Sequence, residues 1–193
     1  MADTKISAMT AATLPLTGAE LVPIVQGGDN KKTTVSDIIA YNRAYGAWSD
    51  STDQTGNISA GTVITYNTQD VADGITLADN SKLTVPNTGV YDLQFSAQLK
   101  NVDNSQHEVV IWFKVNGSDL ANSATTVTVP ARKTSNIFGY AVAAWNIFLD
   151  MNSADYVQIF WLPSSTQVTM EYEPVDALHP AAPSVIVTMQ QVA

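Results

Sequence analysis

The segment KLTVPNTGVYDLQFSAQL, residues 82–99, decides the fold. A strand ends at Pro86, because proline has no N–H group to donate to a neighbouring strand. The next residues, Asn-Thr-Gly at 87–89, are typical of a turn. Side chains at alternate positions share one face of a strand, and the apolar residues that follow the turn alternate in this way: Tyr91, Leu93, Phe95, Ala97 and Leu99. The segment therefore predicts two strands joined by a tight turn, the second strand being long and half-buried.

The chain beyond residue 45 continues as strand-length segments separated by turns. Residues 45–61 are polar and contain glycine, so they mark a boundary, although Trp48 is a candidate start for the first strand. No helical period follows. We expect strands near residues 62–67, 71–77, 81–85, 89–100, 107–116, 122–130, 137–149, 155–163, 166–172 and 183–192. The pattern predicts one all-β body, residues 46–193, folded as a β-sandwich.

Four segments of this body resemble the C1q and tumour-necrosis-factor (TNF) family. They are residues 82–99, VVIWFKVNGS at 109–118, SADYVQI at 153–159 and PSVIVTM at 183–189. The third departs from the family, which more often has Ala-Gly-Asp before this strand. The resemblance implies a jelly-roll β-sandwich that forms a homotrimer packed about its inner sheets.

Several expected strands are apolar on both faces, which bears on assembly. They include residues 109–113, 140–149, 156–162 and 185–189. One face fills the core of the sandwich, and soluble monomers rarely expose the other as a large patch. A closed cyclic oligomer covers the second face, and the alternative is that the chain's own loops cover it. The residues we assign to the trimer interface or the core are Trp112, Tyr140, Trp145, Phe160 and Ile186.

The first 45 residues form a separate block that is too short to bury a core of its own. Residues 20–26 are apolar and β-prone, residues 27–30 signal a turn, and residues 31–35 can return antiparallel. Ser36 then reads as an N-cap, and a short helix is expected to continue to about Ala44. This hairpin-plus-helix is marginal alone, so we interpret residues 1–45 as a docking arm, the alternative being a frayed tail.

The arm is similar to the N-terminal segment of many tailed-phage virion proteins, variously called head fibres, decoration proteins and tail fibres. The similar stretches are ISAMTAA at residues 6–12, LTGAELVPIVQGG at 16–28 and KKTTVSDI at 31–38. The resemblance implies attachment to a virion. For docking on the major capsid protein we assign apolar residues and, as charge partners for an acidic surface, two lysines: Ile6, Leu14, Leu16, Leu21, Val22, Ile24, Lys31 and Lys32.

Composition and charge restrict the classes of partner. The chain has 193 residues, 45% of them hydrophobic and 14% charged, and no cysteine, so one core without disulfides or thiolate metal sites is expected. Its net charge is −9, and the arm holds four bases and four acids, which leaves five bases and fourteen acids in the body. An acidic body argues against binding to nucleic acid or to an anionic membrane.

The sequence offers no catalytic, cofactor or metal motif that stands out. His107 and His179 fall in polar loops, and Asp70, Asp73 and Asp79 lack the order of an EF-hand loop. Glu171 and Glu173 share a strand face, which occurs in glycosidases but is far commoner on a solvated strand. Four tryptophans, Trp48, Trp112, Trp145 and Trp161, are candidates for stacking on a sugar, but their spacing does not decide this.

These observations predict a structural virion protein and no enzyme. We expect a homotrimeric capsid decoration or cement protein on the virion surface, made in the host cytoplasm without a signal peptide, because the N-terminus has no apolar leader. The alternative is a tail-fibre or receptor-binding module that attaches through the same arm and binds a host surface glycan or protein. No long shaft of repeats separates arm and body, which favours the capsid.

Overall fold

A computed structural model describes residues 16, 17, 19–35, 38 and 44–193. The chain divides into two compact units, Met1–Arg43 and Ala44–Ala193; the sequence places this boundary after residue 45. Within the described residues, no helix is long and apolar enough to cross a membrane.

The first unit contains an antiparallel hairpin of β1 (Leu21–Gln26) and β2 (Asp29–Thr34), which confirms the predicted pairing. The turn is shorter than predicted. Only Gly27 and Gly28 form it, with φ of +64° and +87°. Two consecutive positive φ angles are typical of a type I′ turn, whose twist matches that of the strands it joins, so Asp29 and Asn30 pair within the hairpin. The helix expected after Ser36 falls largely outside the described residues.

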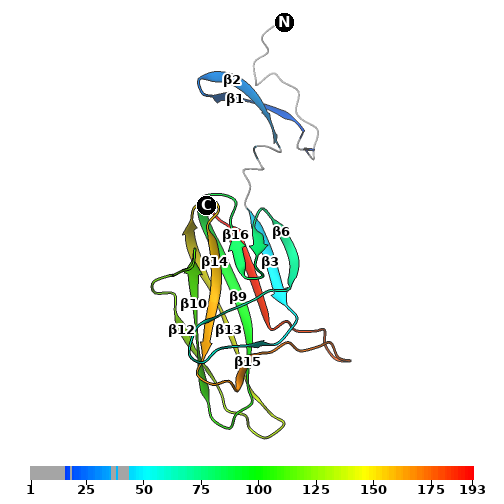
Figure 1. The fold of residues 1–193 in the computed structure, drawn as a ribbon. Helices are drawn as coiled ribbons and strands as arrows, with labels where there is room; N and C mark the ends of the chain where they lie inside the picture. The colour runs from blue at the N-terminus through cyan, green and yellow to red at the C-terminus, as the bar shows by residue number, and fades with distance from the viewer. Residues whose placement is uncertain (1–15, 18, 36–37, 39–43) are drawn as a thin grey trace. The chain divides into compact units, whose positions relative to one another are not determined.

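The second unit is all-β, and its strands form two antiparallel sheets (Figure 1). The first sheet has the order β6-β3-β16-β9-β13, since β13 pairs along the whole of one edge of β9 and leaves β16 and β15 to share the other. Its members are β3 (Tyr45–Asp50), β4 (Gln54–Thr55), β6 (Thr68–Asp73), β9 (Gly89–Asn101), β13 (Gly139–Met151), β15 (Val168–Met170) and β16 (Val185–Gln191).

The second sheet has the order β7-β8-β14-β10-β12, with short β5 and β11 at its margins. Its members are β5 (Thr62–Val63), β7 (Thr76–Ala78), β8 (Lys82–Thr84), β10 (His107–Val115), β11 (Ser118–Asp119), β12 (Thr125–Val129) and β14 (Tyr156–Pro163). The turn at residues 87–89 thus joins a strand of the second sheet to the long β9 of the first.

The core lies between these sheets. The five alternating apolar residues of β9, from Tyr91 to Leu99, are all buried, which confirms the predicted half-buried strand. Phe95 of the first sheet and Phe113 of the second meet edge to face, with ring centroids 5.9 Å apart. Trp48 and Trp161 are fully buried in the same core. One continuous core therefore holds the two sheets together as a sandwich.

The strand predicted at residues 62–67 is wrong in extent, because β5 covers only Thr62 and Val63. Backbone hydrogen bonds from Ile64 and Tyr66 go to two different segments, and side-chain hydrogen bonds add to them. The Gln54 amide donates to the Thr65 carbonyl at 3.1 Å and accepts from the Thr65 N–H at 3.0 Å. Buried Asp50 accepts from Asn67 at 3.0 Å and from the Thr52 N–H at 2.9 Å. Such side-chain bonds compete with strand pairing and are not visible as a sequence period.

Candidate functional site

Strand β13 separates its side chains between the core and the surface. Odd-numbered residues point inward, so Ala143 and Leu149 are buried. Even-numbered residues point outward, and Tyr140, Val142 and Phe148 are 58%, 64% and 62% exposed. This strand is therefore apolar on both faces, as predicted for residues 140–149. We call the side of the first sheet that carries Tyr140, Val142 and Phe148 the outer face.

The register places the rest of the outer face in rows across the strands. Ala144 lies beside Ser96, which lies beside Ile186 on β16. Closer to the other end, Phe148 lies beside Asp92, then Gln190, then Tyr45 of β3. Large apolar side chains thus occupy the two margins of the face, and small or polar side chains occupy its middle. The exposed apolar residues of the margin opposite β13 are Tyr45 and Val71, and Ile186 is an exposed apolar residue of the central strand β16.

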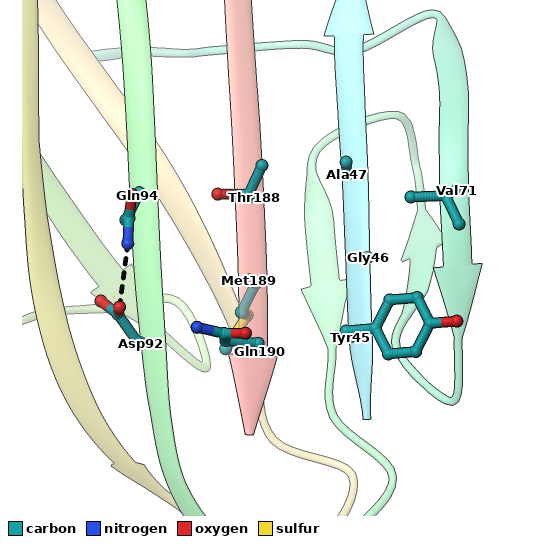
Figure 2. A pocket seen from close by; sticks show the side chains of 9 residues that line it. All are labelled: Tyr45, Gly46, Ala47, Val71, Asp92, Gln94, Thr188, Met189 and Gln190. Carbon is teal, nitrogen blue, oxygen red and sulfur yellow. Dashed lines mark hydrogen bonds between the residues drawn. The ribbon is translucent and has the colours of Figure 1, made fainter. Parts of the chain in front are cut away.

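A pocket of about 260 Å³ lies on this face (Figure 2). Figure 2 shows Tyr45 and Val71 on one side of it and Asp92 and Gln94 on the other. Nine residues line it: Tyr45, Gly46, Ala47, Val71, Asp92, Gln94, Thr188, Met189 and Gln190. The lining is mainly small, apolar or amide-bearing, so it suits a side chain of another protein better than a charged ligand.

Asp92 is the charged group of this pocket, and only 8% of it is exposed. Gln94 Nε2 donates to one carboxylate oxygen at 3.0 Å, and Asn146 Nδ2 donates to the other at 3.3 Å. Burying a carboxylate is costly unless its oxygens accept hydrogen bonds, and these two amides supply them. The three side chains form a polar cluster in the middle of the outer face.

An ion pair occupies the end of the outer face near Tyr140. Lys100 and Glu171 are bonded to each other, and a second pocket, lined by Gln98, Tyr140, Glu171 and Glu173, lies beside them. Desolvation alone would lower the pKa of Lys100, but the hydrogen bond and charge of Glu171 outweigh it and raise this pKa above its usual value. Desolvation, with the charge of Glu171, raises the pKa of Tyr140. Glu171 therefore serves as the counter-ion of a lysine.

The five residues assigned to the interface or the core lie in three places. Tyr140 and Ile186 are on the outer face. Trp145 points toward the core, with its ring 4.6 Å from that of Phe95. Trp112 and Phe160 lie together on the second sheet, with ring centroids 5.7 Å apart. The structure does not bring these five side chains into one surface.

One loop of the chain covers part of the second sheet. From the sequence, cover by the chain's own loops is the alternative to an oligomer. A Cβ atom at Gly61 would lie 2.4 Å from the Trp112 ring, so the loop backbone rests directly on this ring. Trp112 Nε1 also donates to Asp119 at 2.7 Å. Since Trp48 and Trp161 are buried, no exposed tryptophan platform for a sugar is found among the described residues.

The two histidines and Asp79 have local structural partners. His107 Nε2 lies 2.8 Å from Asp103, and His179 Nε2 lies 3.3 Å from Asp176. Asp79 pairs with Lys82 at 2.8 Å. In the part of the chain that the structure describes, no group of three or more His, Asp or Glu side chains is arranged to hold a metal ion.

The docking residues assigned from the sequence divide between the two faces of the hairpin. Val22, Ile24 and Lys31 share one face, whereas Leu21 and Lys32 share the other. Leu16 is 44% exposed, and Ile6 and Leu14 lie outside the described residues. Sequence reasoning missed Val25, which is 72% exposed. Strand alternation is the signal that assigns Val25 to the face of Leu21, because the two residues are four positions apart on one strand.

Comparison with known proteins gives no assignment: no protein-family model matches the chain, and no curated protein matches it.

Proposed function

We propose that this protein is a structural virion protein of a tailed phage, a homotrimeric capsid decoration or cement protein that docks on the major capsid protein. The observation that carries the proposal is a β-sandwich whose outer face has exposed apolar margins, joined to a separate small hairpin with exposed apolar side chains. The resemblance of residues 6–38 to phage attachment segments agrees with a docking role for the hairpin and a separate role for the sandwich.

We infer that the sandwich is a jelly roll of the C1q/TNF type. The order of the longer strands supports this inference, because the chain crosses repeatedly between sheets. Strands β8, β10 and β14 belong to the second sheet, and β9, β13 and β16 to the first. A jelly roll is a double sheet built by crossings of this kind.

The outer face supports self-association. Its apolar margins are on β13 and around Tyr45 and Val71, so different patches of two copies can meet. A contact between unlike patches generates a closed ring when the rotation permits it, and a homotrimer is such a ring. The pocket beside Tyr45 has room for a projecting side chain such as Phe148 of the next copy.

A trimer strengthens docking and gives it a function. The three hairpins of one trimer can bind a repeating capsid lattice at the same time. Each weak contact then raises the effective concentration of the others, and overall binding is stronger. Binding to the assembled shell but not to free subunits stabilises the shell by mass action. The body, with fourteen acids and five bases, stays soluble on the particle surface.

Particle incorporation tests this proposal. We expect a chain lacking residues 2–40 to be absent from purified particles, while the intact chain is present at a copy number comparable to that of the capsid protein. The control is thermal unfolding of the shortened chain, which should match that of the intact body. Unchanged incorporation of the shortened chain would contradict the proposal.

A tail-fibre or receptor-binding module is the second candidate. The loop between Glu173 and Ala182 favours it, because its Leu178 and Val175 are 92% and 69% exposed, as in a tip that contacts a host glycan or protein. Copy number distinguishes the two functions, since a tail appendage is present in far fewer copies than the capsid protein.

A further inference from the structure

The register of the hairpin defines two different faces. Directly paired residues of antiparallel strands lie side by side on the same face. We call the face made by the pairs Leu21–Thr34, Pro23–Lys32 and Val25–Asn30 the Lys32 face, and that made by Val22–Thr33, Ile24–Lys31 and Gln26–Asp29 the Lys31 face. Two neighbouring lysines therefore point in opposite directions.

Exposure distinguishes these faces. On the Lys32 face, Leu21 is 60% exposed and Val25 is 72% exposed. On the Lys31 face, Val22 and Ile24 are half-buried. The apolar area that remains available to another molecule is therefore concentrated on the Lys32 face.

Charge distinguishes them as well. Lys31 shares its face with Asp29, two residues earlier on the same strand, so the charges of this pair cancel. Lys32 shares its face with Asn30, which is neutral. Among the paired residues of the hairpin, the Lys32 face thus carries one uncompensated positive charge amid exposed apolar side chains. Its electrostatic complement is a carboxylate set in an apolar surface.

The outer edge of β1 argues against docking by strand addition. The Val35 N–H donates to the Glu20 carbonyl at 2.9 Å, which makes this pair hydrogen-bonded. Because backbone groups alternate in direction along an antiparallel strand, Leu21, Pro23 and Val25 point theirs to the outer edge. Pro23 has no N–H group and interrupts any ladder there. Strand addition at the edge of β1 is therefore disfavoured.

We infer that the arm binds through the Lys32 face to an apolar protein surface of the particle that carries a carboxylate opposite Lys32. This inference rests on the proposed docking function and assigns its contact surface. It also assigns different roles to the two lysines: Lys32 pairs with that carboxylate, and Lys31 makes no contact with it.

Binding of the full-length chain to particles assembled without it tests this inference, with Lys31→Glu as the matched control for Lys32→Glu. We expect Lys32→Glu to weaken binding by about tenfold or more, as for the loss of an interfacial charge pair, and Lys31→Glu to change it by less than about twofold. Val25→Ser, which removes apolar area without a charge, is expected to weaken binding by about tenfold. Thermal unfolding confirms that each variant keeps its body intact.

The possible outcomes separate the two proposals. Equal losses for both lysine variants, or a loss only for Lys31→Glu, would overturn the inference but leave docking by the arm in place. Full binding by a chain without residues 2–40 would overturn both. Loss confined to Lys32→Glu and Val25→Ser, with a steep decrease of wild-type binding in high salt, would support the inference.

Discussion

Single side chains on β13 show how one strand serves two purposes. Trp145 lies against Phe95 and Phe113, with ring centroids 4.6 and 6.5 Å away, and so helps to join the two sheets. Tyr140, on the same strand, is 58% exposed on the outer face. Both are large aromatics in one apolar run, and their roles differ only because they point to opposite sides of the strand.

Alanine variants of these two residues should have contrasting effects. We expect Trp145→Ala to lower the free energy of unfolding by about 3 kcal/mol, the low end of the range for removal of a buried aromatic, because Trp145 is partly exposed. We expect Tyr140→Ala to leave the dilute body nearly as stable as wild type and to shift the proposed trimer toward monomer. Urea unfolding and sedimentation at several concentrations measure both. If neither Tyr140→Ala nor Phe148→Asp changes the oligomeric state, that result would argue against the outer face as the interface.

Among the elements, the hairpin depends most on its turn. Gly27 and Gly28 have positive φ, and no atom lies within 4 Å of a Cβ atom placed at either position. The requirement for glycine is therefore one of backbone conformation and not of space. Asparagine tolerates this conformation, whereas a β-branched residue does not.

Substitutions at Gly27 should separate conformation from side-chain size. We expect Gly27→Val to destabilise the hairpin by about 1–2 kcal/mol, the cost of a left-handed conformation for an ordinary residue, and Gly27→Asn to be tolerated. Hydrogen exchange of the hairpin amides in the full-length chain measures the effect, which should be faster exchange in Gly27→Val alone. Equal protection in both variants would show that a different turn forms.

At the scale of the whole molecule, several loops of the body contain an ionised carboxylate that accepts hydrogen bonds from nearby side chains. A hydrogen bond from His107 lowers the pKa of Asp103, one from Trp112 lowers that of Asp119, and one from Asn116 lowers that of Asp155, with further bonds in each case. Because a lowered folded-state pKa means that the ionised form is favoured by folding, these groups stabilise the body above their ordinary pKa of 3.8. That contribution is lost as the pH falls through the folded-state values.

Acid should therefore destabilise the body, and most of the change should occur below about pH 4. We expect Asp155→Asn to lower the melting temperature at pH 7 and to reduce its dependence on pH, so that the difference from wild type shrinks near pH 3. The control is Asp73→Asn, at an exposed position. A constant difference between Asp155→Asn and wild type from pH 7 to pH 3 would contradict the role of its charge.

Local patterns in the sequence determine the all-β class, the half-buried β9 and the hairpin, because a period of two and a glycine turn are encoded in neighbouring residues. They also identify strands that are apolar on both faces. Only the tertiary structure decides what covers each face. The loop at Gly61 rests on Trp112, whereas Tyr140 stays exposed. In the same way, the length of one turn decides that Asn30, and not Lys32, pairs directly with Val25. The physical reason is that the burial of a strand face and the register of a strand depend on contacts with residues elsewhere in the chain. A local sequence period does not contain that information.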